Sequence, residues 1–441
     1  MKTVGFISLG CPKNQIDGEC LLAQLDAAGY TVADPYDGVD VVIINTCGFI
    51  EDAKKEAIEN ILDMVQLKED GTIGKIVVTG CLAERYQNEI CKEIPEVDAV
   101  IGIGANKDIA AVCDRMLAGE TVAEFPPKEE LPLNGERVLT TPEYYAYLKI
   151  AEGCNNCCTY CAIPQIRGRF RSREMDDIYE EAVQLAEKGV KELILVAQDT
   201  TLYGKDLYGK FALPELLQKL CTIDGIHWIR MLYCYPDEFT DELIDVMASE
   251  EKVLHYVDLP LQHASNKILK RMNRRCTAEQ ATELIQKLRE RIPDIVLRTT
   301  FITGFPGEGE EEFEELAVFV NETEFDCLGC FAYSAEEGTP AAAFEDRLDE
   351  RTKNDRKEII MNDQYSIVLE KHEALIGQTF EVLVESYDEY SDSYVGRTYR
   401  DAPDIDSVIK FTAHADLNEG DFCMVKVFGV DEYDLIGEAE E

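Results

Sequence analysis

The sequence predicts an α/β protein in three parts: a parallel sheet covered by helices, a partial barrel of six β/α units, and a small antiparallel β-barrel. Residues 1–123 alternate short β-branched runs with helical patterns, and residues 143–375 repeat this alternation six times. Such alternation favours parallel strands with helices on their faces. Residues 376–441 change in texture to short strand-like runs between polar turns, which is typical of small β-barrels.

The N-terminal part contains four expected strands, which span residues 3–9, 39–45, 75–79 and 99–103. The helical pattern after the second strand carries its apolar residues on one face, as a helix packed on a sheet does. Residues 124–142 contain several prolines and show little periodicity, so we interpret them as an interdomain linker.

The central part contains six expected strands, which span residues 145–151, 192–198, 228–234, 256–261, 296–303 and 327–333. In a barrel built from such units, functional side chains lie at the C-terminal ends of the strands. The terminal part contains four expected strands, which span residues 380–385, 394–398, 408–412 and 422–430.

Composition and charge exclude several classes of protein. No apolar run approaches the roughly 20 residues that span a bilayer, and the first apolar stretch, broken by Gly5, resembles a strand more than a secretion signal. We therefore expect a cytoplasmic protein without a membrane partner. The 43 basic and 87 acidic residues give a net charge of −44, which disfavours bare nucleic acid and favours a basic protein as partner.

Sixteen cysteines in a chain of this kind favour metal or redox chemistry over disulfides. Cys154, Cys158 and Cys161 form a C-x-x-x-C-x-x-C motif directly after the first barrel strand. Thiolates at this spacing suit an iron–sulfur cluster in which one iron stays open to a ligand. A zinc site that also uses Cys157 is the alternative, although adjacent cysteines do not easily reach one tetrahedral ion. The spacing alone does not decide between Cys157 and Cys158.

A second group of cysteines follows three N-terminal strands. Cys11, Cys47 and Cys81 are separated by 36 and 34 residues, about one β/α unit each, so all three should reach the same rim of the sheet. We favour a second three-cysteine cluster over three buried structural thiols. The other cysteines are expected to be packing thiols, and those of the C-x-x-C pair within a barrel strand should face opposite sides of it: Cys20, Cys91, Cys113, Cys221, Cys234, Cys276, Cys327, Cys330 and Cys423.

The C-x-x-x-C-x-x-C motif after the first strand of a six-unit barrel resembles the radical S-adenosylmethionine (SAM) superfamily. The resemblance implies that Cys158 is the third ligand of a 4Fe-4S cluster and that SAM binds its open iron. It also implies that one-electron reduction of SAM releases a 5′-deoxyadenosyl radical, which abstracts hydrogen from an unactivated C–H bond.

Two cysteine triads followed by a terminal barrel resemble the methylthiotransferase family over essentially the whole chain, with the terminal barrel as its TRAM domain. This implies that the second 4Fe-4S cluster holds a sulfur species, that one SAM methylates the sulfur, and that another SAM supplies the radical. Four segments most resemble the members that modify the β-carbon of an aspartate in small-subunit ribosomal protein S-twelve: SLGCPKN (8–14), IPQIRGRFRSR (163–173), YCYPDE (233–238) and DAPDID (401–406).

Other residues at the expected barrel rim are candidates for cofactor binding. Gly304 and Gly307 lie in TGFPGE (303–308), a segment that by resemblance helps to hold SAM, although such a stretch alone is often just a turn. Four polar residues end or follow barrel strands, where barrel enzymes place functional groups, namely Gln198, Asp199, Gln262 and His263. His263 can equally be a hydrogen-bonded histidine of the rim.

Basic residues are concentrated beside the cluster loop, at Arg167, Arg169, Arg171 and Arg173. They form either internal ion pairs or contacts with a substrate carboxylate or with cluster charge.

The sequence therefore predicts an enzyme, a methylthiotransferase that acts on ribosomal protein S-twelve, free or assembled, with an external electron donor and a sulfur donor that the sequence does not identify. The alternative is a tRNA adenosine methylthiotransferase. Residues 376–441 contain 17 acidic and 4 basic residues, which disfavours RNA and leads us to expect that Asp401, Asp404 and Asp406 attract a basic substrate. A two-cluster electron carrier or redox sensor would leave the six barrel units unexplained.

Overall fold

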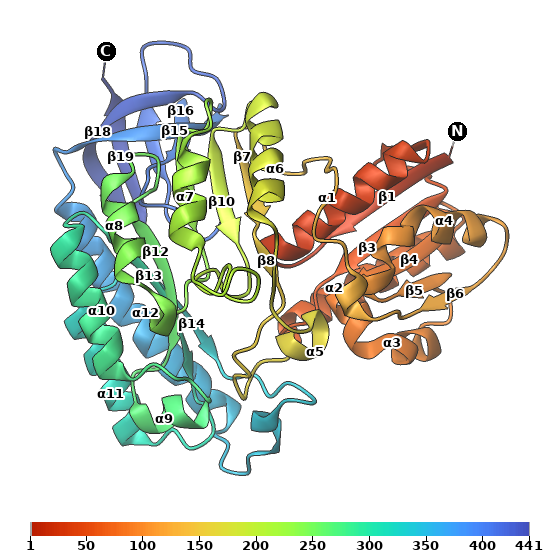
Figure 1. The fold of residues 1–441 in the computed structure, drawn as a ribbon, viewed down its shortest axis with the longest axis horizontal. Helices are drawn as coiled ribbons and strands as arrows, with labels where there is room; N and C mark the ends of the chain where they lie inside the picture. Colours follow the sequence, from red (N-terminus) through yellow and green to blue (C-terminus); the bar gives the residue numbers. More distant parts are fainter. Residues whose placement is uncertain (1, 441) are drawn as a thin grey trace.

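The N-terminal part of the computed structural model, which describes residues 2–440, is a six-stranded parallel sheet with helices on both faces (Figure 1). Its strand order is β2-β1-β3-β4-β5-β6. The strands are β1 (Lys2–Ser8), β2 (Tyr30–Ala33), β3 (Val41–Thr46), β4 (Lys75–Gly80), β5 (Ala99–Ile101) and β6 (Val122–Glu124). The helices are α1 (Pro12–Ala27), α2 (Glu51–Glu69), α3 (Cys81–Glu93) and α4 (Ile109–Leu117), with a 3₁₀ turn η1 (Ile103–Asp108). The four expected strands are present, and β2 and β6 are additional short strands beyond them.

The central part is a partial barrel of six parallel strands in two sheets, ordered β11-β10-β7 and β12-β13-β14. The backbone N–H of Cys234 donates to Asp258 at 2.9 Å and joins the two sheets. The strands are β7 (Tyr145–Lys149), β10 (Glu192–Val196), β11 (Trp228–Met231), β12 (Tyr256–Gln262), β13 (Val296–Thr303) and β14 (Cys327–Ala332). A short hairpin of β8 (Ala151–Glu152) and β9 (Arg171–Ser172) flanks the cluster loop. All six expected strands are found, so the predicted fold class is confirmed.

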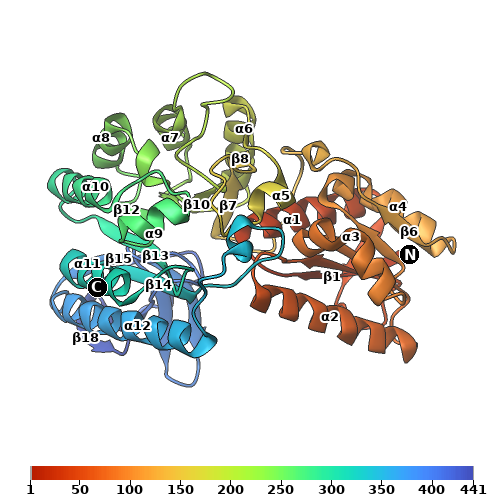
Figure 2. The same ribbon diagram turned by 90° about the horizontal axis from the view of Figure 1, so that it is seen from below.

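The barrel helices pack outside this sheet, as Figure 2 shows from below. Thr277 and Gln280 form a capping box that begins α10, and the side chains of Thr240 and Asp349 cap α8 and α12. The helices are α5 (Ile163–Arg167), α6 (Met175–Glu187), α7 (Leu213–Cys221), α8 (Asp241–Ser249), α9 (Asn266–Arg271), α10 (Ala278–Arg291), α11 (Glu310–Thr323) and α12 (Glu350–Glu373), with 3₁₀ turns η3 (Pro236–Glu238) and η4 (Pro340–Ala343).

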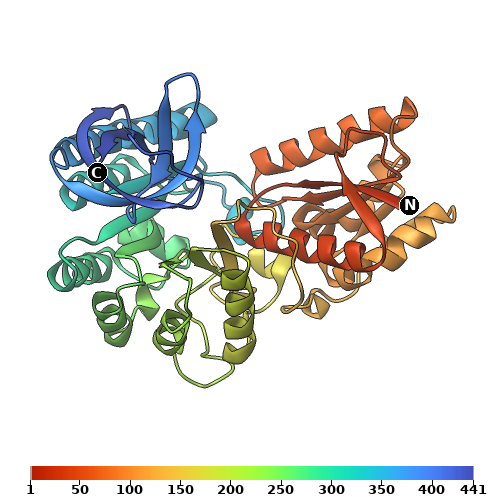
Figure 3. The same cartoon turned by 90° about the horizontal axis from the view of Figure 1, so that it is seen from above.

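The terminal part is a closed five-stranded barrel, ordered β15-β16-β17-β19-β18 and seen from above in Figure 3. Its strands are β15 (Thr379–Asp388), β16 (Ser393–Arg397), β17 (Ile409–Thr412), β18 (Phe422–Asp431) and β19 (Asp434–Ala439). The sheet is antiparallel as expected except at one place, where β17 and β19 pair in parallel and close the barrel. The strand β19 was not expected from the sequence.

Buried ion pairs fix the terminal barrel to the central one. Glu192 of β10 accepts hydrogen bonds from Arg230 at 2.7 Å and from Arg397 of β16 at 2.8 Å, and all three residues are fully buried. Such a network holds the two parts in one arrangement, because separating them would expose unpaired charges.

The expectation that the aspartates of the DAPDID segment (401–406) attract a basic substrate is wrong for two of the three. Asp406 accepts hydrogen bonds from Tyr256 at 2.6 Å and from Arg298 at 3.1 Å, and Asp401 is 6% exposed and accepts one from Thr398. Both carboxylates lie at the contact with the central barrel, and only Asp404 is exposed. Asp406 therefore anchors the terminal barrel to the central one, and the buried Asp401 is likewise not free to attract a partner.

The segment between the first two parts is also packed. It contains the 3₁₀ turn η2 (Lys128–Glu130), and Arg137 is 7% exposed. The Arg137 guanidinium donates to Glu19 of α1 at 2.6 Å and pairs with Glu181 of α6. The segment therefore connects the sheet and the barrel through a buried ion pair. Across residues 2–440, the chain has no helix of the length and apolar character that a membrane crossing requires.

Candidate functional site

The three N-terminal cysteines come together at the C-terminal rim of three adjacent strands. Cys11 follows β1 and is the N-cap of α1, Cys47 follows β3, and Cys81 begins α3 directly after β4. Gly10, at φ +91°, makes this possible, because a Cβ there would lie 2.6 Å from the Cβ of Cys47. Burial, together with the neighbouring Cys11 and Cys47, raises the pKa of Cys81 to about 12 although Arg167 acts to lower it. The three thiols thus influence one another electrostatically.

The barrel cysteines lie on the loop between β8 and α5. Cys158 is buried, and its Sγ lies 3.6 Å from the hydroxyl of Tyr235 and 3.9 Å from Nη1 of Arg274. Burial raises the pKa of Cys161, which the neighbouring Cys158 raises further. Cys157 is exposed with φ +51°, and its carbonyl accepts a hydrogen bond from Asn273. This arrangement favours Cys158 over Cys157 as the ligand.

Both donor sets fit iron–sulfur clusters better than single ions. Each set consists of three thiols from one rim or one loop, which is the chemistry that such clusters require. Among residues 2–440, no three His, Cys, Asp or Glu side chains are arranged to hold one metal ion. A cubane cluster takes each thiolate at a different corner, so its ligands need not converge on one point.

Arg167 contacts the N-terminal triad from the helix that follows the barrel triad. It lies on α5, six residues after Cys161, and its Nη2 donates to Sγ of Cys81 at 3.2 Å. The guanidinium also pairs with Asp17 of α1 and lies 3.5 Å from Glu152 of β8. This arginine therefore forms the internal ion pairs that the sequence suggested, and it also donates to a cysteine of the predicted N-terminal cluster.

The other arginines of this run make no contact with either cysteine triad in the described residues. Arg173 is buried and pairs with Glu181 at 2.6 Å, and Arg171 donates to the carbonyl of Glu129 at 2.7 Å. Arg169 is exposed. Only Arg167 among these four contacts a cysteine of either triad in the described residues.

A buried polar network extends from Arg167 to the barrel rim. Lys149 Nζ lies 2.9 Å from Glu152 Oε2 and also pairs with Asp17. Burial opposes ionisation of Glu152, but Lys149 and Arg167 lower its pKa to about 2. Gln198 donates to Glu152 at 2.6 Å, while its own Oε1 is buried without a partner in the described residues. An orphaned acceptor of this kind suits a bound donor group.

The remaining rim residues differ in what they can contact. Asp199 is fully buried, and it accepts a hydrogen bond from Asn156 at 2.6 Å; burial raises its pKa. Gln262 has φ +73° and donates to the carbonyl of Pro260. His263 lies 3.1 Å from Glu308, and its Nδ1 accepts the N–H of Ser265.

The glycines of TGFPGE serve close packing. Gly304 and Gly307 have φ of +71° and +88°, and a Cβ on either would clash with Lys353 or Arg271. The N–H of Gly304 donates to Glu308 at 2.9 Å, so this turn also holds the partner of His263.

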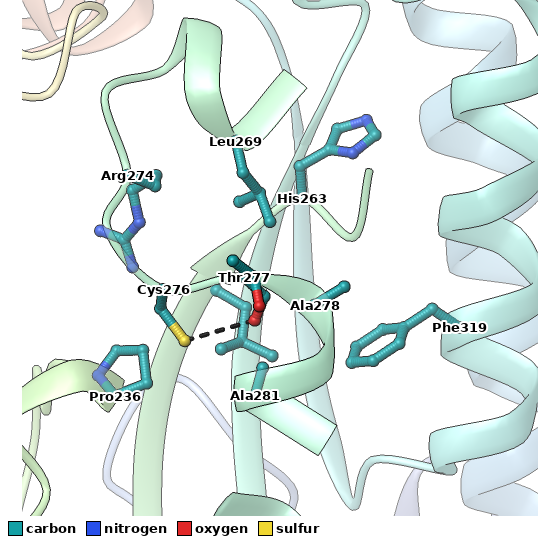
Figure 4. Close-up of a pocket in the computed structure, with 10 residues that line it drawn as sticks. Pro236, His263, Leu269, Arg274, Cys276, Thr277, Ala278, Ala281 and Phe319 are labelled. Atoms are coloured by element: carbon teal, nitrogen blue, oxygen red, sulfur yellow. Dashed lines mark hydrogen bonds between the residues drawn. The ribbon is translucent and has the colours of Figure 1, made fainter. Parts of the chain in front are cut away.

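A small cavity lies between His263 and Arg274, with Leu269 between them (Figure 4). Its volume of about 10 Å³ accommodates no more than a water molecule, so it is not a cofactor cavity.

The sequence did not reveal that two of the four singled-out segments meet. Lys13 of SLGCPKN places its ammonium 3.1 Å from the ring centroid of Tyr233 of YCYPDE. Burial raises the pKa of Tyr233, Lys13 lowers it, and the nearby Cys11 raises it. The contact joins the N-terminal sheet to the end of β11, and no local pattern marks a contact between residues so distant in sequence.

Comparisons with known proteins agree with this architecture. The radical SAM superfamily matches residues 148–320, the uncharacterized protein family UPF0004 matches residues 3–102, and the TRAM domain matches residues 376–439. Among solved structures, the radical SAM methyltransferase TsrM from Kitasatospora setae shares the fold with a TM-score of 0.58 and 14% identity, and 77% of each chain is covered. The cobalamin-dependent SAM radical enzyme OxsB shares it with a TM-score of 0.54 and 14% identity over 83% of this chain and 57% of that one.

Fold and cysteine motif together define a radical SAM protein with a second cysteine triad and a TRAM domain. Curated relatives named ribosomal protein uS12 methylthiotransferase RimO match nearly the whole chain. Those from Lachnoclostridium phytofermentans, Thermoanaerobacter sp. and Clostridioides difficile are 50%, 49% and 46% identical, with 99% of this chain and 99%, 100% and 99% of theirs covered. The chain belongs to this RimO family.

Proposed function

We propose that this protein adds a methylthio group to the β-carbon of an aspartate in ribosomal protein uS12 and acts in the cytoplasm. The observation that carries the proposal is the pair of cysteine triads, which lie on two different parts of the chain, with Arg167 of the helix after the barrel triad donating to Cys81 of the N-terminal triad. The RimO relatives, at 46–50% identity over nearly the full length, support uS12 as the substrate. We also retain the division into residues 1–123, 124–142, 143–375 and 376–441 as a proposal.

The two triads would each hold a 4Fe-4S cluster. The N-terminal cluster would use Cys11, Cys47 and Cys81, and the barrel cluster would use Cys154, Cys158 and Cys161. When bound, the clusters and SAM supply one-electron chemistry at an unactivated C–H bond together with the sulfur, which no side chain can provide. An external electron donor and a sulfur donor are further partners.

The chain's own residues hold the SAM side of the site in place. Gln198, with its unpartnered acceptor, is the candidate for direct contact with SAM. Asp199 is fully buried and already accepts hydrogen bonds from Asn156, Thr201 and Leu202, so it would support the rim behind Gln198.

Two further groups of residues would support the same rim without touching SAM. The polar groups of Gln262 and His263 are already hydrogen-bonded. Gly304 and Gly307 are packed closely against neighbouring side chains, and the N–H of Gly304 is also hydrogen-bonded.

The contact between sheet and barrel fixes the distance between the two triads. Asp17 on the sheet side and Glu152 on the barrel side share Lys149 and Arg167, and all four are almost completely buried. Two cations and two carboxylates balance their charge, so the network excludes water without leaving an unpaired ion. The N-terminal part is thereby held against the barrel rim, where the substrate must reach both clusters.

The terminal barrel favours a basic protein over tRNA. Its aspartates at the domain contact are engaged, but acidic residues away from that contact are exposed, including Glu389, Asp392 and Asp416. Exposed acidic residues repel phosphates and attract a basic protein. We therefore propose that uS12 is attracted by these exposed acidic residues and not by the aspartates at the domain contact.

The proposal is tested by separating radical generation from sulfur insertion. With Cys11, Cys47 and Cys81 replaced by Ala, the reconstituted enzyme should still cleave SAM under reduction, because the barrel supplies the ligands of that cluster. It should form no methylthiolated uS12. Full product formation without this triad would contradict the two-cluster proposal, and mass analysis of uS12 together with quantification of 5′-deoxyadenosine measures both activities.

A further inference from the structure

Lys13 is a buried cation without a carboxylate partner among the described residues. It is 6% exposed and lies on the first turn of α1, two residues after Cys11. Within residues 2–440, no carboxylate oxygen lies within 4.0 Å of its ammonium. The other buried lysines each have such a partner: Lys54 pairs with Glu336, Lys149 with Asp17 and Glu152, and Lys353 with Glu350. Buried charges are normally paired, so Lys13 is the exception that requires an explanation.

The surroundings of Lys13 favour an anion. The first turn of the 16-residue helix α1 contains no acidic residue, so the positive end of the helix dipole is not neutralised by a side chain there. In a chain with net charge −44, a buried ammonium beside such a helix terminus is a local reversal of the overall charge. The neighbour of the ammonium on the barrel side is the face of Tyr233, which stabilises a cation without neutralising it.

The barrel holds Tyr233 in a strained conformation under this lysine. Its φ is +61°, a left-handed value that costs energy for a residue other than glycine. The backbone N–H of Tyr233 donates to Asp258 at 2.9 Å, which fixes the turn at the end of β11. The Lys13 ammonium is thus held at the boundary between sheet and barrel, next to the N-terminal triad.

We infer that Lys13 binds the side-chain carboxylate of the substrate aspartate and makes the enzyme prefer a carboxylate-bearing target. This inference rests on the proposed function. The target carbon must reach both cysteine triads, and its one charged neighbour is the carboxylate on the adjacent carbon. An ammonium and a carboxylate form a charge-assisted hydrogen bond, which would hold the β-carbon beside Cys11 and supply the carboxylate that Lys13 lacks in the described residues.

The experiment compares two forms of uS12, with Asp or Asn at the target position, on the enzyme reconstituted with both clusters and SAM. The dissociation constant of each form is measured anaerobically in the wild-type enzyme and in Lys13→Met. A hydrogen bond between charged groups predicts that the wild-type enzyme binds the Asp form about tenfold to a hundredfold more tightly. In Lys13→Met the two forms should bind equally, with the Asn form bound as in the wild type.

Lys54→Met is the matched control. Lys54 is also a buried lysine of the N-terminal part near a tyrosine ring, Tyr86 at 5.9 Å, but it is paired with carboxylates and lies outside the proposed site. This variant should keep the preference for Asp. Lys13→Arg, which keeps the charge, should keep it as well, and this variant tests the inference even when Lys13→Met fails to retain iron.

A preference for Asp that persists in Lys13→Met would overturn the inference. If the same variant also loses affinity for SAM, Lys13 instead binds the carboxylate of SAM. A wild-type enzyme that does not methylthiolate uS12 at all would instead contradict the proposed function. The two failures are therefore distinguishable.

Discussion

Removing the barrel triad should cost half of the bound iron. Each triad lies on its own structural part, with Cys154, Cys158 and Cys161 on one barrel loop and the other three cysteines at the sheet rim. Two cubanes hold about eight irons, so replacing the barrel triad with Ala should leave about four. SAM cleavage should be abolished, since the remaining cluster belongs to the other part. Iron content after anaerobic reconstitution, together with the absorption and EPR spectra of the remaining cluster, measures this outcome.

Single variants on the cluster loop test which of Cys157 and Cys158 is the cluster ligand. Cys158→Ala should lose the barrel cluster, because this cysteine is buried beside Tyr235 and Arg274, whereas the exposed Cys157→Ala should keep all iron and activity. Complete loss of iron in the triple variant would refute independent clusters. Equal effects of the two single variants would show that the ligand assignment on this loop is wrong.

Three further predictions concern stability and the ion pairs at the domain contacts. Asp406→Lys should set a cation against Arg298 and weaken the attachment of the terminal barrel by about 3–5 kcal/mol, whereas Glu389→Lys should not; protease sensitivity of residues 376–440 measures this. Burial and Arg400 lower the pKa of His372 to about 4, so the folded protein resists its protonation and loses stability as the pH falls from 6.5 towards 4. At pH 5, His372→Gln should avoid about 2 kcal/mol of this loss in the free energy of unfolding, measured with urea. An equal dependence of the unfolding free energy on pH in the wild type and the variant would show that His372 is not responsible. Arg167→Met should destabilise the fold by about 3 kcal/mol, because it leaves two carboxylates to Lys149 alone. It should also reduce iron retention at the N-terminal triad, because the contact with Cys81 is lost. Arg173 contacts no cysteine in the described residues, so Arg173→Met should not change the iron content.

Much of the site could be predicted from the sequence because it depends on regular spacing. Cysteines that follow successive parallel strands must emerge at one rim, and Cys11, Cys47 and Cys81 do so. The alternation of strand side chains likewise placed Cys327 and Cys330 on opposite faces, and they pack into different apolar clusters.

Contacts between the parts of the chain could not be predicted in the same way. The sequence shows that DAPDID is acidic, but only the fold brings Arg298 and Tyr256 against Asp406 and turns an expected surface charge into a buried one. The pairing of Lys13 with Tyr233 has the same origin, since 220 residues separate them in the sequence. The short edge strands β2 and β6 were missed because few residues carry their pattern, and the six-residue β19 inside the closed terminal barrel was missed as well.

The central claim is that the enzyme methylthiolates a ribosomal protein and not an RNA. The most direct test offers equal amounts of uS12 and tRNA to the reconstituted enzyme with SAM and a reductant, followed by mass analysis of both. We expect an aspartate of uS12 in which a methylthio group replaces hydrogen, with unmodified tRNA. Methylthiolated adenosine with unmodified uS12 would contradict the substrate assignment and leave the radical SAM chemistry in place.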